Sequence, residues 1–336
     1  MRSGARAQRP SPPAKGPMRA QQLGRLATLA IIPVMLLAIV WARDSSRQPS
    51  GRPLPPPEGT VLVATLREPA LVALDVGTGG QRSVVLPGAA HELLIVGDRV
   101  YVTLGRADLL AEVQLPSLAL LRTLRLPGEP HGIAWWEGQL AVSLDRAEEV
   151  VAIDPVTLAE RRRWRVGETP HALASFAGDL FVAESRSGTV RRIGEGVVTA
   201  PGGMPESVAV VGSALAAALT EAGALAFVPL AEPGAARIVP VGPRPVRVAD
   251  LGEGLAAVAL SGSGQAAVYR VADGELVWRV RVGQLPDGLC RSPDGRYLAV
   301  TATGDDRLLV LDVASGTAVA EYAVRGGPGA CLWVGR

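Results

Sequence analysis

The residues best suited to chemistry in this sequence are its three histidines, which recur at a fixed spacing. They are His91, His131 and His171, separated by 40 residues and then by 40 again. Each lies in a similar local sequence: GAAHELLIV, GEPHGIAWW and ETPHALASF. Imidazole nitrogens bind zinc, copper and iron, and they act as bases near neutral pH. The spacing predicts three imidazoles at equivalent positions in successive copies of one structural repeat.

The repeat continues along the chain with other residues at the equivalent position. These follow at intervals of 35, 40, 41 and 42 residues and are Glu206, Val246, Asp287 and Gly329. Six of the seven segments have Pro immediately before this position, and all have apolar residues two to four places after it. Each unit also contains further short apolar runs separated by turns, such as RVYVTL, LLAEVQL and LRTLRLPG. Four short strands in about 40 residues are typical of one β-propeller blade.

The two ends of the repeat region predict how the ring closes. The region begins at Thr60 with TVLVAT, which matches the second strand of a blade, and it ends with ACLWVGR, which matches a first strand. The C-terminal strand is therefore expected to become the innermost strand of the blade begun by the N-terminal one. The sequence predicts an all-β, seven-bladed β-propeller over 60–336. Its first strands should begin near residues 91, 131, 171, 206, 246, 287 and 329.

The repeats resemble those of YVTN-type propellers. The resemblance rests on GEPHGIA followed by LAVSLDRAEEVVAID, and above all on SPDGRYLAVTATGDDRLLVLDVASGTAV at 292–319, and it extends over the 277 residues of the repeat region. It implies a propeller whose first strands line a central channel. Similar propellers include surface-layer proteins, lactonases and a streptogramin-cleaving lyase, so the fold does not settle the function.

The resemblance places the repeated position near one mouth of the channel. His91, His131 and His171 would then form an arc on consecutive blades, continued by Glu206, with Asp287 on the same ring. Three imidazoles and a carboxylate are a sufficient ligand set for a divalent metal such as zinc, copper or iron. As an alternative, duplication can copy a histidine that has no role, and inner strands around a wide channel can keep the rings apart.

The two cysteines fall on neighbouring blades in this register. Cys290 lies on the first strand of the seventh blade, and Cys331 on the strand that closes the first. They lie four and three places after their prolines, so they point to opposite faces of their own sheets. This suits two residues that face each other across adjacent blades. It equally allows both side chains to point away from each other. An oxidising compartment would permit a disulfide, and the alternative is two small buried free thiols.

The N-terminal region predicts a membrane attachment. Residues 1–25 carry six basic groups and no acid, and 26–42 form an uncharged apolar run. We expect the basic segment to stay in the cytoplasm and the apolar run to be a signal anchor, or a signal peptide cleaved after Ala42. The propeller would then lie outside the cytoplasm, on a single-pass anchor or secreted. The linker 43–59, with five prolines, should be an extended spacer.

The charge distribution and the absence of known catalytic motifs exclude some classes of function. The chain has a net charge of +2, of which +6 lies in 1–25 and +1 in the linker, leaving −5 for 60–336. A nucleic-acid partner is therefore not expected. No GxSxG or HExxH motif occurs. The sequence predicts a membrane-anchored, extracytoplasmic binding or scaffold module with an unidentified protein or small-molecule ligand. The alternative is a metal-dependent lyase or lactonase, with the histidines as ligands or bases and Glu206 or Asp287 as a general base.

Overall fold

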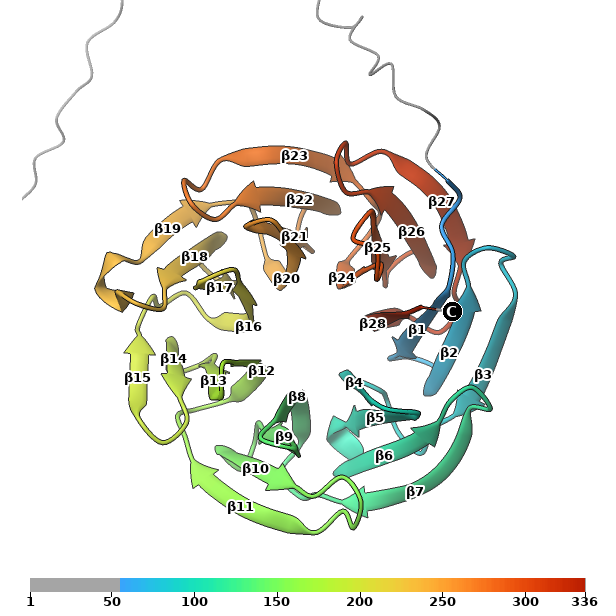
Figure 1. Cartoon of the computed structure of the whole chain (residues 1–336), viewed down its shortest axis with the longest axis horizontal. Coiled ribbons are helices and arrows are strands. Elements are labelled where there is room, and N and C mark those ends of the chain that lie inside the picture. The colour runs from blue at the N-terminus through green and yellow to red at the C-terminus, as the bar shows by residue number, and fades with distance from the viewer. Residues whose placement is uncertain (1–54, 336) are drawn as a thin grey trace, which may run out of the picture. The chain divides into compact units, whose positions relative to one another are not determined.

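Short runs of Val, Leu and Ala, separated by turns rich in Gly and Asp, form 28 strands in residues 55–335, the part of the chain that the structure describes. In this computed structural model they make seven four-stranded antiparallel sheets around a central channel (Figure 1). Two short 3-10 turns, η1 (Gly105–Ala107) and η2 (Pro233–Ala235), are the helical elements of this region. The prediction of a seven-bladed β-propeller is confirmed.

Each blade runs from an innermost to an outermost strand (Figure 1). The innermost strands are β28 (Pro328–Val334), β4 (Leu93–Val96), β8 (Pro130–Trp136), β12 (Pro170–Phe176), β16 (Pro205–Val211), β20 (Pro245–Gly252) and β24 (Pro286–Arg291). The second strands are β1 (Thr60–Thr65), β5 (Arg99–Leu104), β9 (Gln139–Leu144), β13 (Asp179–Glu184), β17 (Ala214–Leu219), β21 (Leu255–Leu260) and β25 (Tyr297–Ala302).

The outer half of each blade completes the sheet. The third strands are β2 (Ala70–Asp75), β6 (Leu109–Gln114), β10 (Glu149–Ile153), β14 (Thr189–Arg192), β18 (Ala224–Pro229), β22 (Gln265–Arg270) and β26 (Arg307–Asp312). The outermost strands are β3 (Gln81–Val85), β7 (Ala119–Arg125), β11 (Glu160–Arg165), β15 (Gly196–Thr199), β19 (Arg237–Pro240), β23 (Leu276–Arg281) and β27 (Ala318–Ala323).

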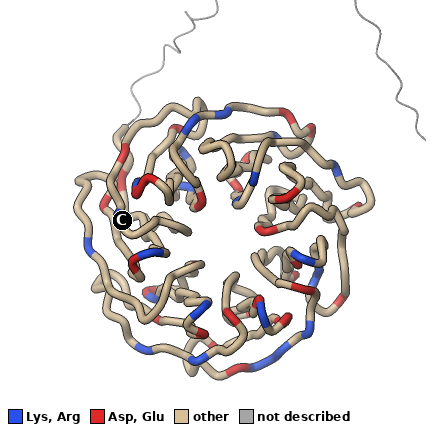
Figure 2. The backbone as a smooth tube through the Cα atoms, turned by 180° about the vertical axis from the view of Figure 1, so that it is seen from behind, with Lys and Arg blue, Asp and Glu red and all other residues tan. Residues whose placement is uncertain are grey.

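Burial follows this order of strands. The middle strands carry apolar side chains on both faces, and every residue of β17 (ALAAAL) is buried. They pack against the neighbouring blades, so the core is a series of aliphatic layers between sheets. The outermost strands are largely polar and exposed, as in β11 (ERRRWR). Acidic and basic positions are both distributed around the whole ring (Figure 2).

The ring closes through the chain ends of the propeller. Strand β28 pairs antiparallel with β1, with Val61 opposite Trp333 and Val63 opposite Cys331. A disulfide joins Cys331 to Cys290 on β24 of the adjacent blade, with Cα atoms 5.7 Å apart. Trp333 Nε1 also donates a hydrogen bond to the carbonyl of Glu58, so the end of the Pro-rich linker packs against the first blade.

The innermost strands begin close to the predicted positions, except in the second blade. Six begin at the proline before the repeated position, whereas β4 begins at Leu93. This blade has Ala90 in place of that proline. The apolar segment 26–42 predicted as a membrane anchor lies outside the described residues. Among the residues that are described, no helix is long and apolar enough to span a bilayer.

Candidate functional site at the channel mouth

The three histidines converge at one mouth of the channel. Their ring centroids lie 4.9 Å apart for His91 and His131, and 3.7 Å apart for His131 and His171. All three line a single cavity of about 320 Å³, together with Glu206 and Asp287. The structure thus brings the five predicted site residues to one place, and the inner strands do not keep the imidazoles apart.

Buried hydroxyl groups hold the backbones that carry these imidazoles. The Ser143 hydroxyl accepts a hydrogen bond from the Gly132 N–H (2.8 Å) and donates one to the His171 carbonyl in the next blade (2.6 Å). Thr103 bridges Glu92 and the His131 carbonyl in the same way. In these two blades a hydroxyl on the second strand therefore fixes one first strand against the next. This contact is tight, since a Cβ added at Gly132 would clash with the His171 carbonyl oxygen.

The hydrogen bonds of the imidazoles differ. His171 Nδ1 lies 2.7 Å from the backbone carbonyl of Glu206, which can only accept, so Nδ1 carries the proton and Nε2 is bare. His131 Nδ1 is buried and has no hydrogen-bond partner within the described region. Buried polar atoms are nearly always paired, with protein, water or an ion, so this nitrogen is a candidate ligand atom.

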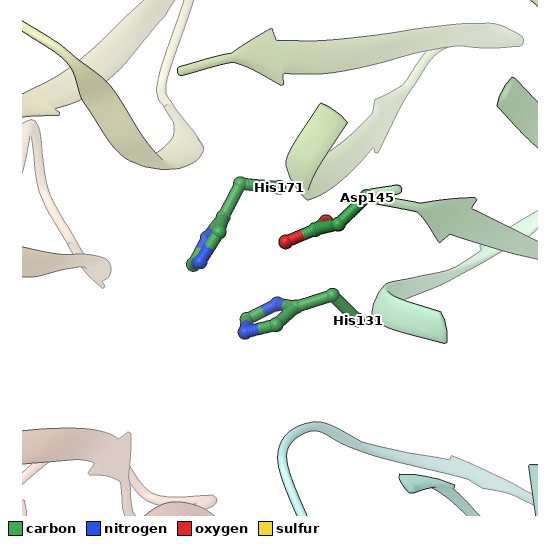
Figure 3. A group of neighbouring side chains, drawn as sticks. All are labelled: His131, Asp145 and His171. Carbon is green, nitrogen blue, oxygen red and sulfur yellow. The ribbon is translucent and has the colours of Figure 1, made fainter. Parts of the chain in front are cut away.

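Asp145 is a member of the site that the sequence analysis missed. It follows β9 directly, and its carboxylate lies with His131 and His171 so that one ligand atom from each falls within 4.8 Å of the others (Figure 3). Its Oδ1 is also buried without a partner. Burial raises the pKa of Asp145 to about 8, and the charges of Glu129 and Glu206 contribute to the rise. A signal was present, because the residues after the other second strands are Leu, Gly, Ser or Thr.

The imidazoles are held neutral. Burial lowers the pKa of His131 well below its ordinary value, and the adjacent His171 and His91 lower it further. Burial is also the main cause of the lowered pKa of His171 and of His91. Neutral imidazole is the form that binds metal ions, so no proton has to be displaced from these rings near neutral pH.

Arg247 forms a second feature that sequence analysis missed. It lies one place after the repeated position on β20, and its guanidinium contacts Glu92 Oε1 (2.6 Å) and Asp287 Oδ1 (3.1 Å). Glu92 precedes β4, on the opposite side of the channel from β20 (Figure 1). Burial opposes the charge of Arg247, but the two carboxylates outweigh it and raise the pKa of the guanidinium. Asp287 is therefore occupied by an ion pair with the neighbouring blade, and the same guanidinium reaches across the channel to Glu92.

Glu206 lines the mouth cavity, as predicted, but its side chain makes its own contact there. Its Oε2 lies 3.0 Å from the Thr220 hydroxyl, and it is absent from the group formed by His131, Asp145 and His171. Burial raises the pKa of Glu206. Its backbone carbonyl, however, orients His171. Its structural contribution to the histidine cluster is thus made through the main chain.

Comparisons with known proteins identify the fold and no family. No protein-family model matches the chain, and no curated protein matches it. Among solved structures, a functionally unknown protein from Desulfotomaculum acetoxidans is similar with a TM-score of 0.69 at 13% identity, over 83% of this chain and 99% of that one. Virginiamycin B lyase from Staphylococcus aureus is similar with a TM-score of 0.61 at 14% identity, over 73% and 92%.

A third similar structure is hydrazine synthase from Kuenenia stuttgartiensis, with a TM-score of 0.64 at 17% identity, over 74% of this chain and 90% of that one. Proteins with such different names share this architecture. The chain is therefore a seven-bladed β-propeller, and its function has to be argued from its own site.

Proposed function

We propose that this chain is a membrane-anchored, extracytoplasmic propeller of the YVTN type that acts as a binding module and takes a divalent metal ion at its channel mouth. The convergence of all three histidines on one cavity carries the proposal. Neutral imidazoles are ready to bind a metal ion, and Asp145 can add a carboxylate ligand when the ion displaces its proton.

The extracytoplasmic location rests on two features. The basic residues 1–25 precede an apolar run at 26–42, which is the arrangement that keeps an N-terminus in the cytoplasm. A disulfide between Cys290 and Cys331 also fits an oxidising compartment. Alkaline phosphatase fused after Arg336 should be active, because this reporter requires export. Activity of a reporter that works only in the cytoplasm would refute the orientation.

Metal binding is tested directly by titration. Purified protein, first treated with a chelator, should bind Zn²⁺ near neutral pH in isothermal calorimetry. His131→Ala should weaken binding by more than about 100-fold, because even the hydrogen-bond partners of metal ligands typically contribute about 10- to 100-fold. The proposal fails if neither protein binds Zn²⁺, Cu²⁺, Ni²⁺ or Mn²⁺, or if the variant binds as tightly as the wild type.

A second candidate is a metal-dependent lyase or lactonase. The observation in its favour is the cavity of about 320 Å³ beside the imidazoles, which has room for part of a small organic molecule. The similar lyase is also known as a catalytically inactive His-to-Ala variant with quinupristin. Chromatography of quinupristin incubated with Zn²⁺-loaded protein tests this role, and unchanged quinupristin would count against that substrate.

A further inference from the structure

The proposed metal site can be made more specific from the positions of four side chains. His131, Asp145 and His171 bring one ligand atom each within 4.8 Å of the others. His91 is outside this group, and its ring packs over Gly105, where an added Cβ would lie 3.3 Å from it. Two buried atoms of the group, His131 Nδ1 and Asp145 Oδ1, have no partner among the described residues.

The group also has the hydrogen bonds that normally orient metal ligands. A ligating histidine usually donates its other N–H to a carbonyl, and the Nδ1–H of His171 does so to Glu206. The Ser143 hydroxyl holds the backbone of the same histidine. His171 Nε2 is thus oriented and unprotonated before any ion arrives.

The mouth cavity reaches two of the three members of this group. His131 and His171 line it, whereas Asp145 does not. Asp145 therefore stands behind the two imidazoles as seen from the channel mouth, and its carboxylate points toward them (Figure 3). An ion held by the three side chains would have its remaining side toward the cavity.

We propose that His131, Asp145 and His171 form a three-ligand centre for a divalent transition metal, with an open coordination position that faces the mouth cavity. This inference rests on the metal binding proposed above and specifies its ligands. Two imidazoles and one carboxylate suit Zn²⁺, Co²⁺, Ni²⁺ or Fe²⁺; Mg²⁺ and Ca²⁺ prefer sites made of oxygen ligands alone. Three protein ligands with a free fourth position are typical of zinc centres that bind an exchangeable molecule.

Co²⁺ is the probe of choice, because its visible absorption reports on its ligands. The full-length protein should bind one Co²⁺, and azide should then change the spectrum by entering the open position. Asp145→Ser should weaken Co²⁺ binding by more than about 100-fold, a loss larger than that typical of an outer partner. Serine occupies the equivalent position in two other blades, at Ser185 and Ser261, so this variant is expected to fold.

Two further variants complete the comparison. His91→Gln should cost less than about tenfold in Co²⁺ affinity, since it removes a neighbour of the centre and not a ligand. Glu137→Gln removes an exposed carboxylate at the far end of β8 and serves as the matched control, with unchanged affinity.

The outcomes separate this inference from the proposed function. If Co²⁺ binds but Asp145→Ser has no effect, or if His91→Gln costs as much as His131→Ala, the ligand set proposed here is wrong. If Co²⁺ binds and azide leaves the spectrum unchanged, the open position is refuted while metal binding stands. If the wild type binds neither Co²⁺ nor Zn²⁺, both proposals fail.

Discussion

At the scale of single residues, Arg247 shows how this channel mouth is organised. It links the sixth blade to Asp287 on the seventh and to Glu92 on the second, so one side chain ties together strands that are far apart in sequence. The side chains of Arg247 and Glu92 are each 20% exposed, so these charges are only partly in water. A ligand in the cavity therefore meets both this ion pair and the imidazoles, because all of them line it.

Removing the guanidinium should destabilise the protein. Arg247→Met leaves Glu92 and Asp287 close together without a counter-charge. We expect a loss of about 1–3 kcal/mol in the free energy of unfolding, between the values typical of exposed and of buried pairs. Urea denaturation measures this loss. Arg247→Lys should lose less, because it keeps the charge, and equal stability of Arg247→Met and wild type would contradict the argument.

The sequence predicted the three histidines of the site but not Asp145 and Arg247, which lie beside them. Regular spacing of a rare residue type revealed the arc of His91, His131 and His171. Asp145 and Arg247 lie at other positions of the repeat. Comparison of the units could have selected Asp145 as the only acid directly after a second strand, but nothing in the sequence selects Arg247. Asp145 and Arg247 belong to the site because their side chains reach neighbouring blades. Whether they can do so depends on the radius of the ring and on the side-chain rotamers. Neither quantity can be derived from the spacing of the repeats.

At the scale of strands, the buried hydroxyl groups explain how neighbouring blades keep a fixed register at the mouth. Thr103, Ser143 and Thr301 are fully buried, and each bridges its own blade to the first strand of the next. A first strand has no hydrogen-bonded neighbour on its channel side, because it is the edge of its sheet. These hydroxyls provide part of the missing attachment.

Ser143 should therefore affect both stability and the site. Ser143→Ala leaves the Gly132 N–H and the His171 carbonyl unpaired in a buried place, which should cost about 1–3 kcal/mol in the free energy of unfolding. Zn²⁺ affinity should also fall, because the His171 backbone loses a support. Ser143→Thr is the matched control, since Thr103 fills the same role one blade earlier. Calorimetric unfolding and zinc titration would show whether the two losses occur together.

The strand pattern itself was largely predictable. Alternating apolar runs and turns predicted four strands per unit, and the prolines marked where six of the seven innermost strands begin. The shorter β4 was not predicted, because its unit lacks the proline and the apolar pattern does not show where pairing starts. Hydroxyl bridges were missed for a different reason. Ser and Thr within an apolar strand look like ordinary strand residues until the neighbouring blade is in place.

At the scale of the whole molecule, the closure of the ring combines a strand pairing with a covalent link. Strand β28 lies between β1 of its own sheet and β24 of the adjacent blade, to which Cys331 is bonded. The bond spans 41 residues of sequence, so it restricts one blade of the unfolded chain.

Breaking this bond should lower stability without changing the fold. The entropy of a loop of that length corresponds to about 3–4 kcal/mol, so Cys331→Ser should lower the free energy of unfolding by about this amount. Cys290→Ser should give the same loss, and the double variant should be no worse than either single one. Mass spectrometry of the unreduced protein provides a direct check. If both thiols react with an alkylating reagent, the cysteines are not paired.

Closure by a separate strand also gives this protein a route to reciprocal exchange between molecules. If β28 detaches, β1 becomes an exposed sheet edge, and β28 becomes a strand that can complete any identical edge. Two open molecules can then trade their β28 strands and form a swapped dimer that makes every native contact. The bond between Cys331 and Cys290 holds β28 beside β24 of the same molecule and therefore opposes this strand exchange. Reducing the bond would therefore remove one barrier to this exchange.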